Sequence, residues 1–163
     1  MTDEQRIKTL EETISRLLQW IAAAEARISV VLGLDTAMLG AIAVFAPTPK
    51  MWSTSAVAFA AIAVTALALS LTFLAAASFP RTNGPKQSLI YFGGIAERDP
   101  DQFLSEIKTL TADKYIDDLS RQCHRNAQIA LTKFSWIKRA KIALFFGIAP
   151  WAIALFVLYQ LKQ

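Results

Sequence analysis

Two long stretches of this sequence carry no charged residue. Twenty-seven consecutive uncharged residues run from Ser53 to Phe79, and eighteen more run from Ile142 to Tyr159. An apolar stretch of about 18 residues or more is long enough to cross the hydrocarbon core of a bilayer as a helix. With 54% apolar and 18% charged residues, the chain is also more apolar than an ordinary soluble domain. These features predict a membrane protein and argue against a soluble enzyme.

A further apolar stretch precedes the first of these two. Residues 28–46 end at Pro47 and would form a helix about 28 Å long, which is enough to span a bilayer. The turn 47–52 then joins this stretch to the next one as a membrane hairpin. We therefore expect an all-α membrane protein with three transmembrane helices, whose N-terminal and central cytoplasmic helices form a small bundle. The expected segments are a cytoplasmic amphipathic helix, a transmembrane hairpin, a cytoplasmic helical region and a third span: residues 1–27, 28–79 (spans about 28–46 and 54–79), 80–141 and 142–160.

The positive charges predict the orientation in the membrane. Residues 1–27 carry four Lys/Arg, the hairpin turn carries only Lys50, and the connection between Phe79 and Ile142 carries eleven. The positive-inside rule then places the N-terminus and the long connection in the cytoplasm, with the turn, Lys162 and Gln163 outside. No cleaved secretory signal is expected, because the first twelve residues are rich in Asp and Glu. The net charge of +4 thus has a topological explanation and does not indicate nucleic-acid binding.

The N-terminal helix carries an apolar stripe that needs a partner. Its apolar residues recur at steps of three and four, as in a coiled-coil seam: Ile7, Leu10, Ile14, Leu17, Ile21, Ala24 and Ile28. Small residues, which let helix backbones approach closely, then recur every four positions: Ser29, Gly33, Ala37 and Ala41. We expect a homo-oligomer in which Leu10, Leu17, Gly33, Ala37 and Ala41 pack at helix contacts. The alternative is that the stripe packs within one protomer against the helix at 115–137.

The polar connection contains two helix starts. Asp99 before Pro100 is a good N-cap and first helical residue, and this helix should end near Leu110. Thr111 is predicted to cap a second helix that continues into the third span. One broad apolar face is expected on it: Tyr115, Ile116, Leu119, Cys123, Ala127, Ala130, Phe134 and Ile137. Residues 88–96, SLIYFGGIA, fit either a strand or a buried helical turn.

No motif for catalysis or metal binding is present. The sequence has no Walker loop, no GxSxG and no HExxH, and the single Cys123 and His124 cannot build a Cys/His zinc site within one chain. We therefore expect neither an enzyme nor a resident cofactor or metal.

Asp35 is the one acid inside a predicted span. Such an acid costs about 2.5–3.5 kcal/mol on insertion scales and usually faces protein or water. It continues the seven-residue step through Ile28, so it is expected to point at neighbouring helices, with Ser70 and Thr72 at similar depth. Two roles fit this position. Asp35 either holds the bundle together or lines a path for ions or water.

The helix before the third span carries a polar set of amides and cations. Lys or Arg could bind a phosphate there and the amides a base edge: Gln122, Arg125, Asn126, Gln128 and Lys133. Lys133 follows Gln122 and Asn126 by eleven and seven residues, near one side of a single helix. A solvated helix face would explain the same residues, and Lys133 could instead reach toward lipid phosphates.

SLIYFGGIA, followed by QCHRNAQIALTKF and a terminal span, resembles the transmembrane effector family of Pycsar antiphage systems. The opening helix, WIAAAEARISVVLGLDTAMLGAI, and the hairpin after it fit the same order of parts, so the resemblance covers almost the whole chain. It implies a multi-pass protein of the bacterial inner membrane whose partner, a pyrimidine nucleotide cyclase, makes cyclic UMP or cyclic CMP on infection. The effector would then damage the membrane and cause abortive infection.

The pattern elements that the resemblance carries onto this chain are candidate ligand-binding residues: Ser88, Tyr91, Phe92, Gly93, Gly94, Gln122, Asn126 and Lys133. The implied partners are the lipid bilayer, further copies of the chain and the cyclase, with no nucleic acid. Two other readings stay open, namely a constitutive structural or scaffolding membrane protein and a holin-like pore without a nucleotide ligand.

Overall fold

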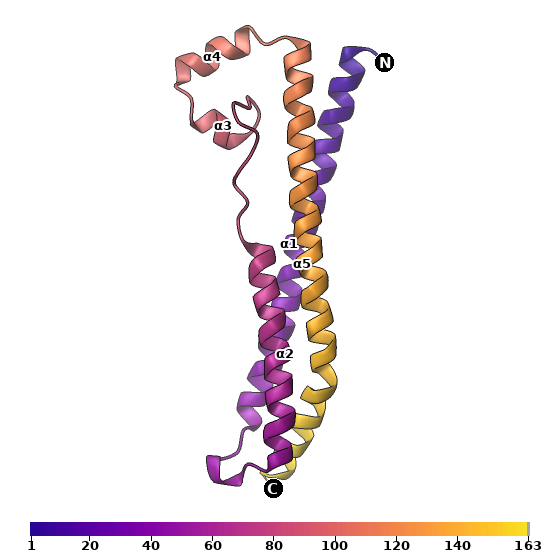
Figure 1. The fold of residues 1–163 in the computed structure, drawn as a ribbon, viewed down its shortest axis with the longest axis vertical. Helices are drawn as coiled ribbons and strands as arrows, with labels where there is room; N and C mark the ends of the chain where they lie inside the picture. Colours follow the sequence, from indigo (N-terminus) through magenta and orange to yellow (C-terminus); the bar gives the residue numbers. More distant parts are fainter. Residues whose placement is uncertain (163) are drawn as a thin grey trace. The chain divides into compact units, whose positions relative to one another are not determined.

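The computed structural model describes residues 1–162, and every regular element within them is a helix. Three helices are long enough and apolar enough to cross a membrane, as predicted. Figure 1 labels the α-helices in chain order: α1 (Asp3–Phe45), α2 (Thr54–Ser78), α3 (Phe92–Ala96), α4 (Pro100–Lys108) and α5 (Ala112–Gln160). A 3₁₀ turn, η1 (Pro49–Met51), lies between α1 and α2. Gln163, which is predicted to lie on the outer side of the membrane, is not among the described residues.

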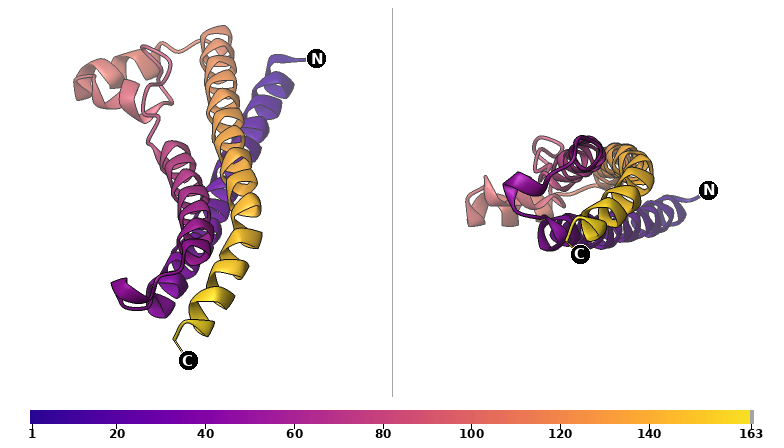
Figure 2. Two further views of the ribbon diagram at one scale, coloured as in Figure 1. Left: turned by 60° about the horizontal axis from the view of Figure 1, so that its bottom comes forward. Right: turned by 90° about the horizontal axis from the view of Figure 1, so that it is seen from below.

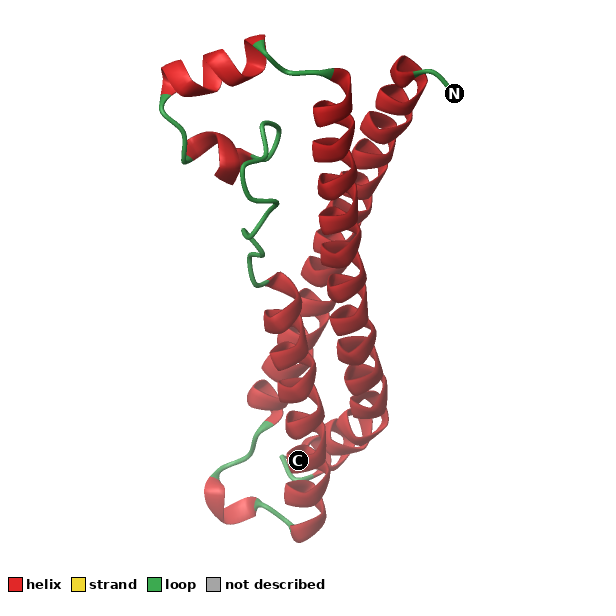
Figure 3. Ribbon diagram, turned by 45° about the horizontal axis from the view of Figure 1, so that its top comes forward, coloured by secondary structure: helices red, strands yellow, loops and turns green. Residues whose placement is uncertain are grey.

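The helix starts lie where the capping residues predict them. Asp99 Oδ2 accepts a hydrogen bond of 3.1 Å from the Asp101 amide at the start of α4. Thr111 Oγ1 accepts one of 3.4 Å from the Lys114 amide at the start of α5. Figure 3 shows the connection from α2 to α3 as a loop, and the ambiguous run SLIYFGGIA ends in the short helix α3 rather than in a strand.

The chain divides into two compact units. The polar unit comprises Met1–Ala23 and Pro80–Thr132, and the apolar unit comprises Ala24–Phe79 and the residues from Lys133 onward. Helices α1 and α5 each supply residues to both units, whereas α2 belongs to the apolar unit alone. The assignment of these units to cytoplasm and membrane stays a prediction.

Coiled-coil packing holds the apolar unit together. In Figures 1 and 2, α2 lies beside α1 and α5 over this unit. The buried residues of α2 recur at alternating steps of four and three, which keeps one face toward its neighbours in a supercoiled bundle: Ala56, Ala60, Ala63, Leu67, Ser70, Leu74 and Ala77. Most of them are small, so the helix backbones can approach closely without large side chains between them.

The part of the N-terminal stripe that precedes Ala24 packs within the polar unit. Leu17 is buried, and the Cys123 thiol of α5 lies 3.5 Å from the Leu10 carbonyl oxygen of α1. Tyr115 of α5 donates a hydrogen bond of 2.8 Å to the Glu11 carboxylate. The first turns of α1 therefore meet α5 of the same chain. The prediction that Ala127 lies on the buried face of α5 is wrong, since Ala127 is exposed and its neighbour Asn126 is buried. Asn126 shares the buried face because it lies seven residues from both Leu119 and Lys133.

Candidate functional site

A carboxylic acid lies fully buried in the apolar unit. Asp35 of α1 is 0% exposed, and its Oδ2 accepts a hydrogen bond of 2.7 Å from Ser70 Oγ of α2. The other oxygen, Oδ1, is buried and has no hydrogen-bond partner within the described residues. Thr72 does not join this pair, since its hydroxyl bonds the Ala68 carbonyl of its own helix. A polar contact at a heptad position fixes the register of two helices, so Asp35 and Ser70 align α1 with α2.

Lys133 of α5 lies against the C-terminal end of α2. Its Nζ donates a hydrogen bond of 2.9 Å to the Ala77 carbonyl and forms an ion pair with Glu25 of α1. The last carbonyls of a helix lack intrahelical donors and carry a partial negative charge, so a cation there is favourable. Lys133 is only 5% exposed. A ligand that used this ammonium would have to replace one of these two contacts.

Two similar contacts with α1 are made near the C-terminal end of α5. Lys162 Nζ donates a hydrogen bond of 3.0 Å to the Val44 carbonyl in the last turn of α1, and Trp151 Nε1 donates one of 2.9 Å to the Met38 carbonyl. A lysine near the middle of α5 and one just after its end thus donate to carbonyls in the last turns of α2 and α1.

Ser88 and Gly94 build a tight turn in the polar unit. The buried Ser88 Oγ accepts hydrogen bonds from the amides of Ile90 (3.2 Å) and Tyr91 (2.9 Å). A Cβ at Gly94 would lie 2.4 Å from the Ser88 carbonyl oxygen, so the backbones approach too closely for any other residue. Arg98 then joins the two segments, because its Nη1 donates to the carbonyls of both Ser88 (3.0 Å) and Gly94 (2.5 Å).

Tyr91 fixes the loop that follows α2. Its hydroxyl donates to the Thr82 carbonyl, and its ring lies so close to Gly84 that a Cβ there would be 2.2 Å from the ring. A Cβ at Gly93 would also meet this ring, at 2.7 Å. Phe92 is 64% exposed, and the centroid of its ring lies 4.6 Å from that of the Tyr91 ring. Tyr91 and its two glycines therefore shape the loop.

This loop and α5 line a wide, open pocket of about 720 Å³, which we call the loop cavity. Cations, an imidazole and amides line it, and none of its lining residues is acidic: Asn83, Gly84, Pro85, Ser120, Arg121, His124, Arg125 and Gln128. Arg125 Nε donates a hydrogen bond of 2.5 Å to the Asn83 carbonyl, which ties the loop to α5. The Gln128 amide lies 3.0 Å from His124 Nε2. Arg125 Nη1 also donates to Gln128 Oε1 at 3.5 Å, and a guanidinium has five N–H groups, so Nη2 could still donate to an anion.

A second cavity of the polar unit, of about 650 Å³, has mixed charge. Its lining includes four cations and four carboxylates: Lys86, Arg98, Lys114, Arg121, Glu97, Glu106, Asp117 and Asp118. Asp118 accepts a hydrogen bond of 2.7 Å from the Leu89 amide, and hydrogen bonds from Gln102 and then Arg98 lower the pKa of Glu106. These carboxylates make the second cavity less favourable than the loop cavity for an anionic ligand.

Gln122 and Asn126 lie outside the loop cavity. Asn126 is buried, and its Nδ2 has no hydrogen-bond partner within the described residues; the same holds for the buried Oε1 of Gln122. Cys123, between them, faces α1, and burial raises the pKa of its thiol. Ligand binding by the residues named from the sequence stays a prediction. Within residues 1–162, no group of three or more His, Cys, Asp or Glu side chains could hold a metal ion.

Arg98 and Asp118 are structural residues that the sequence analysis missed. Both act on backbone groups near Ser88 that are brought close only by the folded turn. Neither lies in a periodic pattern or a motif, so the sequence contains no signal for them.

Comparison with known proteins identifies the family. The sequence model of the Pycsar effector protein domain matches residues 9–160, nearly the whole chain. No curated protein and no solved structure matches the chain significantly. The match includes all three membrane-length helices, the turn at Ser88 and the loop cavity. The chain therefore belongs to the Pycsar effector protein domain family and acts as an antiphage effector of the membrane-protein type.

Proposed function

We propose that this effector binds cyclic UMP or cyclic CMP in the cytoplasm and then impairs the integrity of the bacterial inner membrane. Membership in the Pycsar effector family supports an effector role linked to a cyclase. Three membrane-length helices support an action on the bilayer. A homo-oligomer is part of this proposal, since three helices of one chain leave little room for a pore between them.

The loop cavity is the ligand site that we favour, and its charge is the observation that supports it. A cyclic nucleotide carries one negative phosphodiester, and arginine guanidinium groups are well suited to bind phosphate oxygens. Arg121 and Arg125 both line the cavity, but Arg121 is ion-paired with Asp117 at 2.9 Å, so Arg125 is the cation that we expect to bind the phosphodiester. Asn83 lies beside it in the lining and could offer its amide to a base edge. Tyr91 acts here as a positioning residue, because it holds the loop at Thr82 and Gly84.

Covalent connection supplies the route from ligand to membrane. The loop of the cavity begins directly after α2, and the opposite wall is α5, which continues into the third membrane-length stretch. A ligand can shift an equilibrium between two states only by its different affinity for them, and a shift from 1:99 to 99:1 takes about 5.5 kcal/mol. Several charge-assisted contacts in each copy of an oligomer would supply that difference.

Equilibrium binding of labelled cyclic UMP and cyclic CMP to the full-length protein in detergent tests the proposal. We expect Arg125→Gln to weaken binding by roughly tenfold or more, as for a charge-assisted hydrogen bond. Arg139→Gln is the matched control, because Arg139 lies over the Trp136 ring in the apolar unit, 4.5 Å from its centroid. Unchanged binding by Arg125→Gln would exclude the loop cavity. A wild-type protein that binds neither nucleotide would refute the sensing proposal and favour the scaffolding or holin-like function.

A further inference from the structure

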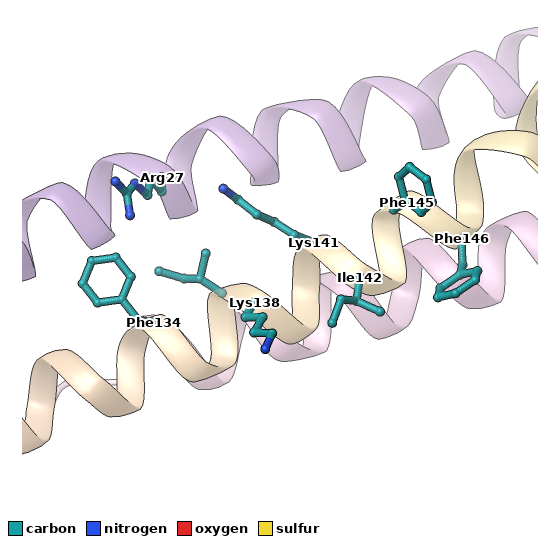
Figure 4. Close-up of a pocket in the computed structure, with 8 residues that line it drawn as sticks. Arg27, Phe134, Lys138, Lys141, Ile142, Phe145 and Phe146 are labelled. Carbon is teal, nitrogen blue, oxygen red and sulfur yellow. The ribbon is translucent and has the colours of Figure 1, made fainter.

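We propose that the apolar unit carries a binding site for an anionic phospholipid, in a groove between α1 and α5. Figure 4 shows this groove, whose cavity is about 370 Å³. This site is distinct from the nucleotide site proposed above. It requires only that the three helices lie in a bilayer.

The polar end of the groove is cationic. Arg27 of α1 and both Lys138 and Lys141 of α5 line it, and no acidic side chain is among its lining residues. In Figure 4, Lys141 extends from α5 toward α1, on the side where Arg27 lies over Phe134. The guanidinium carbon of Arg27 is 5.2 Å from the centroid of the Phe134 ring, which fixes the position of this cation. The nearby acid Glu25 is already paired with Lys133.

The other end of the groove is apolar. Lys141 is the last charged residue before twenty uncharged ones, and Ile142, Phe145 and Phe146 continue the lining. Phe145 and Phe146 are each 71% exposed, so their rings are available to an acyl chain. The two lysines and the two phenyl rings lie within about two turns of α5, roughly the distance from a lipid phosphate to the first part of its acyl chains.

This arrangement matches the chemistry of an anionic phospholipid. Basic pockets between transmembrane helices on the cytoplasmic side bind anionic headgroups, each cation contributing about 1 kcal/mol near an anionic surface. A soluble phosphate would use the cations but leave the exposed rings uncovered. A zwitterionic lipid would cover the rings but place an ammonium group among three cations. Which leaflet supplies the lipid depends on the membrane orientation proposed above, whereas the site itself does not depend on it.

Native mass spectrometry of the full-length protein, released from detergent with added phosphatidylglycerol or phosphatidylcholine, tests the proposal. We expect wild-type protein to retain phosphatidylglycerol preferentially. Arg27→Gln with Lys141→Gln should weaken its apparent affinity by roughly 25-fold, at about fivefold for each cation removed. Arg16→Gln with Arg139→Gln removes the same charge from α1 and α5 outside the groove, and it should retain the wild-type affinity.

Three results would overturn the proposal. Equal retention of the two lipids by the wild-type protein would refute the proposal. This comparison needs no substitution, so it does not depend on how well a variant folds. Equal weakening by the groove pair and the control pair would mean that net charge alone attracts the lipid. Displacement of phosphatidylglycerol by millimolar glycerol 3-phosphate would show that the groove binds a soluble phosphate.

Discussion

The hydrogen bond between Asp35 and Ser70 gives a measurable prediction about the membrane bundle. Ser70→Ala removes the donor of the 2.7 Å bond to a fully buried carboxyl group. Hydrogen bonds between transmembrane helices contribute about 0.6 kcal/mol on average and about 1.7 kcal/mol at most. The contact at Asp35 is short and excluded from solvent, so we expect Ser70→Ala to destabilise the bundle by about 1 kcal/mol.

Asp35→Asn distinguishes a protonated Asp35 from an ionised one. No ion pair includes Asp35 within residues 1–162, and its second oxygen has no partner there. A carboxylate left ionised in such a place would be strongly destabilising, by about 3–5 kcal/mol for an uncompensated buried charge. We therefore expect a neutral acid. Asparagine keeps an acceptor for Ser70 and should change stability by less than about 1 kcal/mol.

A double-mutant cycle measures this contact. Unfolding of the wild type, Ser70→Ala, Asp35→Leu and the double variant is followed by circular dichroism during titration with sodium dodecyl sulfate in mixed micelles. We expect a coupling energy of about 1 kcal/mol, with Ser70→Ala nearly neutral once Asp35 is leucine. A coupling energy near zero would mean that this bond does not hold α1 and α2 together. Stabilisation by several kcal/mol in Asp35→Asn would mean that the acid is ionised in the bundle.

Three further predictions concern glycines and topology. Gly94→Ala should open the Ser88 turn, because its Cβ would lie 2.4 Å from a backbone oxygen, and amide hydrogen exchange near Ser88 should then accelerate. Gly33→Ala is the control: its Cβ would meet open space, so the exchange rate near Ser88 should not change. A leucine at position 33 would also point into open space in the protomer, so Gly33→Leu should disturb only contacts between copies. A smaller particle size in detergent would show that the small-residue ridge joins copies, and an unchanged size would argue against that contact. Alkaline phosphatase fused at Lys50 or at the C-terminus should be active, and an inactive C-terminal fusion would contradict the third span.

The sequence predicts the long helices well, because absence of charge over membrane length has few explanations. It also predicts the orientation of Asp35, since a seven-residue step from Ile28 keeps it on the buried face of a supercoiled helix. The same spacing applies to α5, where Leu119, Asn126 and Lys133 all lie buried seven residues apart. A hydrophobic pattern alone misses Asn126, because it assigns burial by residue type rather than by register.

The turn at Ser88 could not be derived in the same way. Its short apolar run fits a helix or a strand equally, and the outcome depends on Arg98 and Asp118, which bind backbone groups of the folded turn. The position of Lys133 likewise depends on a carbonyl of α2, fifty-six residues away in the chain. Of the small-residue ridge, Gly33 and Ala37 remain exposed and Ala41 half-buried in the protomer, so contact between copies stays a prediction.

Membrane depolarisation in living cells tests the central claim most directly. Cells that express the effector at a fixed level, with or without a cyclase that makes cyclic UMP or cyclic CMP, are followed with a potential-sensitive dye. We predict depolarisation only when effector and nucleotide are both present, and its loss in Arg125→Gln but not in Arg139→Gln. Depolarisation by the wild-type effector without either nucleotide, or none with both nucleotides present, would contradict a nucleotide-triggered membrane effector.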